Sequence, residues 1–349
     1  MTGDLIDRLW YQQSRPLALL APLAWLYRNV AESRRRKAWH ALKQTLPVPV
    51  VVVGNITAGG TGKSPLTARL VSLMQSNGWR PVILSRGYGG KSAEYPLLVK
   101  PDTPVATSGD EPLMLAIATG CPVVVDPDRS RAAQWALEQG LGSVLICDDG
   151  LQHYRLPRDI ELAVFDSARG IGNGAMIPVG PLREPVERLQ GVDFVILNGA
   201  EFPHTGERIT EYAGQEHPGI HAMALRPAAL MNLASGEQRP PEALKGQKVT
   251  ALAGIGNPGR FFRTLRALGA DVTERPFADH HRFKPMDLSA IDTDWLVMTA
   301  KDAVKCQGFA PENAWVLTVQ AELSDPFEQT FLERLAACAA GANECPIEH

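Results

Sequence analysis

From residue 48 onward, short apolar runs alternate along the chain with stretches whose apolar residues recur at helical intervals. The run 50–53 consists of four valines, a composition typical of a strand buried on both faces of a parallel sheet. The stretch 65–77 follows it and has the apolar spacing of a helix. Further runs of strand length lie at 81–84, 122–125, 143–147, 162–165 and 194–197. This alternation predicts an α/β fold with a mostly parallel sheet flanked by helices.

A second α/β pattern begins at Lys248, after a stretch rich in Pro, Gly, His and Glu with weaker periodicity. Its expected elements are strands at 249–253, 271–274, 295–299 and 314–319, and helices at 260–268 and 327–339. At 349 residues the chain is long for one domain. We therefore expect an N-terminal helical segment at 1–40, a core domain at 41–215, an inter-domain connection at 216–247 and a smaller C-terminal α/β domain at 248–349.

The N-terminal segment combines an apolar run with a basic cluster. Residues 17–27 form an apolar run of about eleven residues, whereas a spanning helix needs roughly 20. The basic cluster 34–37 (RRRK) follows it, with three tryptophans nearby. This pattern is typical of an amphipathic helix that lies on a membrane surface and contacts anionic headgroups. The alternative is a helical hairpin packed on the core, with a solvated basic end. A cleaved signal peptide would carry its positive charge before the apolar run and a small-residue cleavage site after it, and neither is evident in this sequence.

Composition and charge narrow the possible partners. The formal net charge is −3, so the chain lacks the overall basic character of a nucleic-acid binder, and we expect no nucleic-acid partner. Its five cysteines are widely spaced without a CxxC pair, which favours a reducing compartment and gives no sign of a metal site. No feature of the sequence calls for an obligate protein partner.

The strongest chemical signal is a glycine-rich loop between the first strand and the following helix. Its residues are Thr57, Ala58, Gly59, Gly60, Thr61, Gly62, Lys63 and Ser64. The backbone N–H groups of such a loop close around phosphate oxygens, and the helix N-terminus favours negative charge. In this pattern the lysine reaches the β and γ phosphates and the serine hydroxyl holds Mg²⁺. The core is therefore expected to be a P-loop NTPase-like domain that takes ATP and Mg²⁺, although a threonine replaces the first glycine of the Walker pattern.

Two other classes of P-loop protein fit less well. Partition-type ATPases carry a second lysine near the start of the loop, where this chain has Ala58. GTPases need a guanine-reading Asn/Thr-Lys-x-Asp segment, and the nearest candidate, 299–302 (TAKD), lies at the wrong spacing. Both classes are therefore less favoured, although a P-loop alone does not identify a kinase.

A second signal is the apolar strand 143–147, which ends in Asp148 and Asp149. Such a placement resembles a Walker B segment, which puts a carboxylate beside the magnesium of the nucleotide at the C-terminal edge of the sheet. A strand that ends in Asp-Asp-Gly is also compatible with a plain turn. Its position behind a P-loop favours the metal role.

Several motifs together resemble those of the tetraacyldisaccharide 4′-kinases, the lipid A 4′-kinases of Gram-negative bacteria. In chain order these are 53–65 (VGNITAGGTGKSP), 85–89 (SRGYG), 109–112 (GDEP), 148–153 (DDGLQH), 178–184 (PVGPLRE), 253–258 (AGIGNP), 277–281 (FADHH) and 299–302 (TAKD). They cover about residues 50 to 305, and the threonine at the first Walker position is itself family-like.

The resemblance implies a specific reaction. Such enzymes transfer the γ-phosphate of ATP to the 4′-hydroxyl of a tetraacylated glucosamine disaccharide 1-phosphate, the lipid A disaccharide precursor. They work as peripheral proteins at the cytoplasmic face of the bacterial inner membrane. Their P-loop core is accompanied by a smaller C-terminal domain that closes over the active site.

By the same resemblance, Asp110 is the base that accepts the proton of the acceptor hydroxyl, supported by a histidine of 277–281. Of the two candidates we choose His281 over His280. The two motifs are expected to come from different domains and to meet when the cleft closes. From the residues alone, Asp110 would as readily cap the helix that begins at Pro112, and the histidines would be a loop feature.

Further residues receive roles on the same basis. Glu184 joins Ser64, Asp148 and Asp149 as a candidate for the metal shell. Arg129 and Arg183 are candidates to neutralise charge on the phosphoryl oxygens. Candidates for the lipid-substrate side are Arg86, Tyr88, Gln152 and His153.

Two other functions remain as alternatives. One is a membrane-docked P-loop NTPase switch, which would release free phosphate and form no phosphorylated lipid. The other is a silent nucleotide-binding module, against which the intact Lys63, Ser64 and acid pair argue. The Asp110 and histidine motifs argue against a simple switch.

Overall fold

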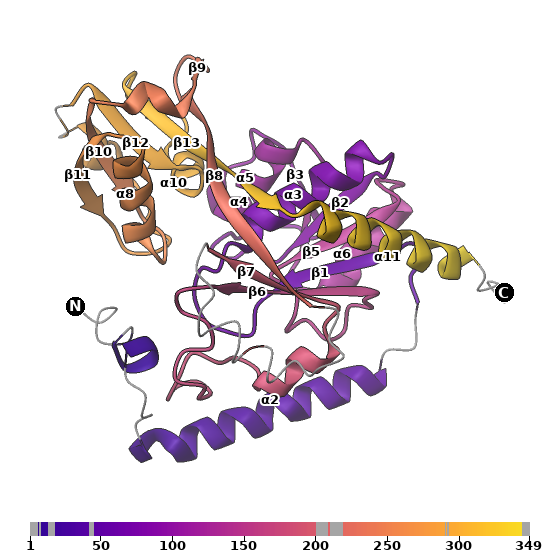
Figure 1. The fold of residues 1–349 in the computed structure, drawn as a ribbon. Coiled ribbons are helices and arrows are strands. Elements are labelled where there is room, and N and C mark those ends of the chain that lie inside the picture. The colour runs from indigo at the N-terminus through magenta and orange to yellow at the C-terminus, as the bar shows by residue number, and fades with distance from the viewer. Residues whose placement is uncertain are drawn as a thin grey trace. The chain divides into compact units, whose positions relative to one another are not determined.

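The protein is described by a computed structural model, whose chain Figure 1 follows from the indigo N-terminus to the yellow C-terminus. The structure describes residues 6, 8–12, 18–41, 45–199, 209, 219–289, 291 and 293–343. The fold is α/β and is built on a large, mostly parallel mixed sheet. Every strand predicted from the apolar runs is present, which confirms the predicted α/β fold class.

The chain divides into two compact units, each made of separate segments. The first contains residues 1–85, 128–224 and 322–349, and the second contains residues 86–127 and 225–321. This division differs from the predicted boundaries. Residues 86–127 do not belong with the rest of the predicted core, and the C-terminal helix does not belong with the predicted C-terminal domain. The predicted connection at 216–247 also differs, because most of it is regular structure, including the strand β8 (Ile220–Asn232).

The sheet of the first unit is parallel, in the order β8, β7, β6, β1, β5 and β2. The bounds of the other strands are β1 (Val50–Gly54), β2 (Pro81–Ser85), β5 (Val144–Asp148), β6 (Ile160–Asp166) and β7 (Phe194–Asn198). All five residues of β1 are buried. Strands covered on both faces have no polar side to display, which explains the unbroken valine run.

Helices pack on this sheet through apolar stripes. Helix α3 (Lys63–Ser76) contacts β1, β2 and β5 and buries leucines on its inner face. Helix α6 (Arg129–Glu138) contacts β2, and its N-terminus is capped by the Asp128 carboxylate, which accepts hydrogen bonds from the backbone N–H groups of Ser130 and Arg131. A short helical segment, η3 (Val186–Gly191), precedes β7.

The C-terminal helix α11 (Asp325–Asn343) belongs to the first unit because its inner face packs there. Phe327 and Phe331 are fully buried, and their ring centroids lie 5.2 and 6.3 Å from that of Phe194 on β7. Arg69 of α3 makes an ion pair of 2.6 Å with Glu328. The helical spacing of 327–339 predicted the element, but the partner of its apolar face depends on a contact across more than a hundred residues.

The second unit contains four further parallel strands, in the order β11, β10, β12 and β13, followed by the end of β8. Their bounds are β10 (Lys248–Ala253), β11 (Asp271–Pro276), β12 (Trp295–Thr299) and β13 (Ala314–Leu323). Strand β9 (Gln238–Arg239) pairs antiparallel with β8, and β3 (Leu97–Val99) pairs antiparallel with β4 (Val123–Val125). The described helical segments of the second unit are α4 (Val105–Ser108), α5 (Asp110–Thr119), η4 (Pro241–Leu244), α8 (Pro258–Ala267), α9 (Pro285–Ser289), α10 (Ala300–Ala303) and η5 (Val304–Cys306).

Both faces of this second group of parallel strands are covered, because alternate residues of β12 enter different apolar clusters. Trp295 and Val297 pack with the phenylalanines of α8, whereas Leu296 and Met298 pack with Phe283. The alternation of side chains along a strand places the two sets on opposite faces.

The described N-terminal residues form η1 (Arg8–Gln12), η2 (Ala18–Leu20) and one unbroken helix, α2 (Ala21–Ala41) (Figure 1). Large apolar side chains of this segment are exposed, including Leu19, Leu23, Trp25 and Leu26. Within the described residues, no helix combines the length and the apolar character needed to cross a membrane.

Candidate active site

The glycine-rich loop lies between the end of β1 and the first turn of α3, as the sequence predicts. Gly62 has a φ of 94°, in the left-handed region that favours glycine. A Cβ atom there would also collide with the side-chain amide of Asn198, which donates a hydrogen bond of 2.9 Å to the Thr61 carbonyl oxygen. From the other side, the Ala58 N–H donates to the Pro181 carbonyl at 2.8 Å. The loop is therefore held in one conformation by residues far from it in the chain.

The first acid of the predicted pair, Asp148, is buried at the end of β5 and faces helix α3. Its carboxylate accepts a hydrogen bond of 2.9 Å from the Thr67 hydroxyl and one of 3.3 Å from the Ser64 hydroxyl. The structure thus brings together Ser64 and Asp148, both predicted to serve the metal. A hydroxyl and a carboxylate are the kind of oxygen ligands that Mg²⁺ prefers.

The second acid, Asp149, faces two positive charges. Its Oδ1 atom lies 3.4 Å from Lys63 Nζ, and its Oδ2 atom lies 3.7 Å from Arg183 Nη1. Burial would raise the pKa of Asp149, but the charges of Lys63 and Arg183 outweigh burial and hold this pKa below its ordinary value. Asp149 is therefore ionised at neutral pH. Its φ of 52° places it in a tight turn after the strand.

Glu184 is placed differently from the other predicted metal ligands. It is 1% exposed and accepts a hydrogen bond of 2.6 Å from Gln152 Nε2, while Arg188 Nε lies 3.4 Å from its Oε2 atom. Among the described residues, no group of three or more acidic, histidine or cysteine side chains is arranged to share a metal ion. Glu184 thus does not form one ligand cluster with Asp148 and Asp149, because Gln152 and Arg188 engage its carboxylate.

Arg129 begins helix α6 and is 5% exposed. Its Nη2 atom donates to the Asp149 carbonyl at 3.4 Å, whereas its Nε atom is buried without a hydrogen-bond partner in the described part of the chain. Its backbone N–H donates to His153 Nε2 at 3.2 Å. A buried guanidinium with an unused N–H donor, next to the acids that follow β5, suits an anionic ligand. Burial and, next, the charge of Arg129 lower the pKa of His153 to about 4.

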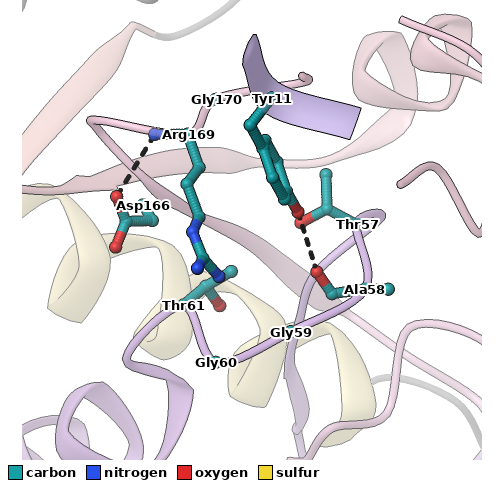
Figure 2. A pocket seen from close by; sticks show the side chains of 9 residues that line it. All are labelled: Tyr11, Thr57, Ala58, Gly59, Gly60, Thr61, Asp166, Arg169 and Gly170. Carbon is teal, nitrogen blue, oxygen red and sulfur yellow. Dashed lines mark hydrogen bonds between the residues drawn. The ribbon is translucent and has the colours of Figure 1, made fainter. Parts of the chain in front are cut away.

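Figure 2 shows a pocket beside the glycine-rich loop, which is also lined by Tyr11, Asp166 and Arg169. The sequence did not indicate a role for these three residues. The Tyr11 hydroxyl donates a hydrogen bond of 3.2 Å to the Ala58 carbonyl, and the Arg169 guanidinium lies 5.0 Å from the centroid of the Tyr11 ring. Asp166, at the end of β6, accepts a hydrogen bond of 3.3 Å from the Arg169 backbone N–H. Asp166 ends an apolar strand as Asp148 does, so its position in the sequence could have marked it as a candidate site residue. Nothing in the local pattern marked Tyr11.

In the second unit, Asp110 is buried at the start of α5 and contacts a histidine of the 277–281 motif. Its Oδ2 atom lies 3.0 Å from His280 Nδ1, and its Oδ1 atom accepts a hydrogen bond of 2.9 Å from the Glu111 N–H. His281 instead places Nε2 3.2 Å from Asp287 Oδ2. The predicted pairing of Asp110 with His281 is therefore wrong in this structure, where His280 makes it. Because His280 has a φ of 58°, the turn sends neighbouring side chains in different directions.

The expectation that Asp110 and the histidine motif belong to different domains is also wrong, since residues 86–127 and 225–321 form one compact unit. Tyr88 lies in the same unit, with its ring centroid 4.9 Å from that of His280. Arg86 is exposed there. Of the four residues predicted for the lipid side, Arg86 and Tyr88 thus belong to the second unit, while Gln152 and His153 belong to the first.

Lys301, at the start of α10, adds a charged group that the sequence had not assigned. Its Nζ atom lies 3.0 Å from Glu111 Oε1, 3.5 Å from Asp279 Oδ1 and 3.5 Å from His280 Nε2. Burial would lower the pKa of Lys301, but the negative charges of Glu111, Asp110 and Asp279 outweigh burial and raise it. Lys301 is therefore an ammonium ion at neutral pH. In the sequence, its segment 299–302 is identified only as one of the family-like motifs, without a role for the lysine.

Comparison with known proteins places this chain in a family. The family model described as tetraacyldisaccharide-1-P 4′-kinase matches residues 16–336. The tetraacyldisaccharide 4′-kinase of Pseudomonas aeruginosa (strain UCBPP-PA14) is 46% identical over 329 residues, which cover 93% of this chain and 95% of that protein. The enzyme of the same name from Stenotrophomonas maltophilia (strain R551-3) is 47% identical over 337 residues, or 95% and 97% of the two chains.

A solved structure agrees with these sequence matches. The crystal structure of the "apo" form of LpxK from Aquifex aeolicus in complex with ATP has a TM-score of 0.74 and 29% identity to this chain, and covers 92% of this chain and 98% of that one. The chain therefore belongs to the tetraacyldisaccharide-1-P 4′-kinase family and acts as an ATP-dependent lipid kinase in lipid A biosynthesis.

Proposed function

We propose that the loop 57–64 binds the phosphates of ATP and that the γ-phosphate is transferred to the 4′-hydroxyl of a tetraacylated glucosamine disaccharide 1-phosphate. Three observations support this donor site. The loop leads into the N-terminus of α3, and Gly62 at this point has a left-handed conformation. Lys63, Arg129 and Arg183 surround the ionised Asp149. The related Aquifex aeolicus protein was crystallised with ATP.

Proton acceptance is assigned to Asp110, oriented by His280. The single observation that carries this assignment is the contact of 3.0 Å between the buried Asp110 carboxylate and His280 Nδ1. A sugar hydroxyl is a weak nucleophile, so transfer gains from a base that takes its proton as the new O–P bond forms. Asp110 also receives the Glu111 N–H, and two hydrogen bonds to its oxygens fix the direction of its remaining lone pairs.

The residues present also fit a magnesium ion. Ser64 and Asp148 supply a hydroxyl and a carboxylate beside the phosphate loop, and Asp149 adds an ionised carboxylate. When bound, Mg²⁺ neutralises part of the phosphate charge. Arg129 and Arg183 supply fixed positive charge near the same acids and stabilise the transferring group electrostatically. Glu184 is proposed to act by positioning Gln152. The Gln152 amide also donates a hydrogen bond of 2.8 Å to the carbonyl of Asn55, just before the glycine-rich loop.

The experiment uses purified protein, labelled ATP and the disaccharide 1-phosphate acceptor, followed by lipid extraction and chromatography. We expect phosphate in the lipid fraction, and Asp110→Asn to lower turnover by about 10²–10⁴-fold with nearly unchanged ATP affinity by calorimetry. His280→Ala should reduce turnover strongly, and His281→Ala, its matched control in the same turn, should reduce it far less. Release of free phosphate without labelled lipid would support the NTPase switch instead. A greater loss in His281→Ala than in His280→Ala would reverse the assignment of the histidines.

We further propose that the N-terminal segment docks the enzyme peripherally on the cytoplasmic face of the bacterial inner membrane. The acyl chains of the substrate remain in a bilayer, so docking raises the local concentration of the headgroup. The support is the apolar surface of α2, where Leu23, Trp25 and Leu26 are exposed, followed by the basic cluster 34–37. Anionic headgroups are the expected partner of this cluster.

Vesicle flotation tests the docking proposal. The double variant Trp25→Ser/Leu26→Ser should bind anionic vesicles more weakly than the unchanged protein. The matched control is Met286→Ser, which removes another exposed apolar side chain, located in the second unit. Equal flotation of all three proteins would contradict docking through α2.

A further inference from the structure

The role of Lys301 is not explained by phosphate binding or by the Asp110 pair alone. It is a largely buried side chain, and Glu111 and Asp279 hold its ammonium group against His280. The contact atom on the histidine is Nε2, the ring nitrogen that does not face Asp110. Lys301 and Asp110 thus lie at opposite nitrogens of one imidazole ring.

The numbers of N–H donors and acceptors on Lys301 and His280 decide which ring nitrogen of His280 carries the proton. An ammonium group has three N–H donors and no acceptor. A neutral imidazole has one protonated nitrogen and one acceptor nitrogen. Next to Lys301, Nε2 is therefore the acceptor, and the ring proton is on Nδ1. From Nδ1 it is donated to the Asp110 carboxylate over 3.0 Å.

Asp279 is the group that would favour the opposite arrangement. Its Oδ1 atom lies 3.9 Å from His280 Nε2 and would stabilise a proton there. The same oxygen lies 3.5 Å from Lys301 Nζ, so the ammonium group competes for this carboxylate. The uncharged Tyr88 ring also contacts the imidazole, with the two ring planes tilted by 55° and their centroids 4.9 Å apart. Lys301 is therefore the group that opposes protonation of Nε2.

We infer that Lys301 is a positioning residue that sets His280 in the Nδ1–H tautomer, so that the ring donates to Asp110 and leaves the carboxylate ionised as the proton acceptor. This inference rests on the proposed role of Asp110. In this arrangement Lys301 acts on the imidazole of His280, and the carboxylates of Glu111 and Asp279 hold its ammonium group in place.

The first measurement is the tautomer itself, by long-range ¹H–¹⁵N NMR correlation on the full-length protein with labelled histidine, assigned with His280→Ala. The unchanged protein should show a protonated Nδ1 and an unprotonated Nε2 at His280. Lys301→Met should move proton occupancy to Nε2, while Lys301→Arg should retain the original tautomer. The matched control is Lys284→Met, which removes an exposed lysine of the same unit. A protonated Nε2 in the unchanged protein would overturn the inference.

Turnover gives the second readout. Lys301→Met should lower kcat by about 10²-fold, the lower end of the range for acid–base assistance, with KM for ATP unchanged. In the His280→Ala background the same substitution should cause no further loss, because residues that act as a unit are not additive. A merely structural lysine would instead add its loss to that of His280→Ala, and this result would overturn the inference.

Failure of the inference is distinguishable from failure of the proposed function. If Asp110→Asn retains full turnover, the base assignment fails, whatever the tautomer of His280. If Asp110 is required but the tautomer of His280 is unchanged in Lys301→Met, only the inference fails. Where Lys301→Met does not fold, as circular dichroism would reveal, the tautomer of the unchanged protein and of Lys301→Arg decides.

Discussion

His153 provides a test of the electrostatics around Arg129, beside the proposed phosphate site. Burial and the charge of Arg129 lower its pKa from 6.5 to about 4, against the smaller opposing effect of Asp128. Its Nε2 atom accepts a hydrogen bond from the Arg129 N–H, so the folded protein requires the neutral ring. The perturbation is acidification from pH 7 to pH 5, compared between the unchanged protein and His153→Gln, whose side-chain oxygen can accept the same N–H.

The sign and size follow from the difference between the folded and unfolded pKa. Between pH 6.5 and about pH 4 the unfolded chain binds a proton at His153 that the folded protein does not. Stability from this group is therefore fully present above pH 6.5 and is lost as the pH falls. Linkage gives a loss of about 2 kcal/mol between pH 7 and pH 5. Because 20% of the side chain is exposed, we reduce the expected loss to about 1 kcal/mol for solvent screening.

Two assays measure this effect. In NMR titration, one of the eight histidines, identified by its absence in His153→Gln, should not titrate between pH 7.5 and pH 5. In denaturant unfolding, the unchanged protein should lose about 1 kcal/mol more than the variant over the same range. The comparison between the proteins cancels the titration of the other groups. A His153 resonance with a midpoint near the ordinary histidine value, or equal pH slopes for both proteins, would refute the reasoning.

Two further substitutions test the phosphate site and its support. Lys63→Ala should lower turnover by about 10²–10³-fold with unchanged circular dichroism, and full turnover by the folded variant would contradict phosphate binding by this loop. Arg188→Met removes a guanidinium that pairs with the buried Glu161 and Glu184, so denaturant unfolding should record a loss of about 3 kcal/mol. A loss below about 1 kcal/mol would mean that Arg158, which lies 2.7 Å from Glu161, compensates the charge alone.

Much of the local structure at the proposed phosphate site could be predicted, because its parts are close together in the sequence. The valine run of β1, the glycine-rich loop and the first turn of α3 follow one another within fifteen residues, at 50–64. The acids after β5 follow the same rule, since the carboxyl ends of neighbouring parallel strands meet at one edge of a sheet. A strand, a tight turn and a helix each have a periodicity or composition that a short window contains.

The long strand β8 was missed for a related reason. Its residues are mostly half-buried and include a proline, so the window has neither an unbroken apolar run nor strict alternation. Its partners on either side decide its structure. The pairing with β7 is made by backbone hydrogen bonds, which carry no signature in the side chains.

The sequence by itself determined most of the strands and helices, the glycine-rich loop, the acid pair after β5 and the motif that contains Asp110. Only the tertiary structure decided that His280, and not His281, contacts Asp110, and that Lys301 faces the other side of that ring. Adjacent histidines are equivalent in a motif, but the backbone of a turn directs them to different neighbours. Asp110 and His280 are 170 positions apart, and contacts at such separation depend on how whole elements pack, which no local pattern of residues contains.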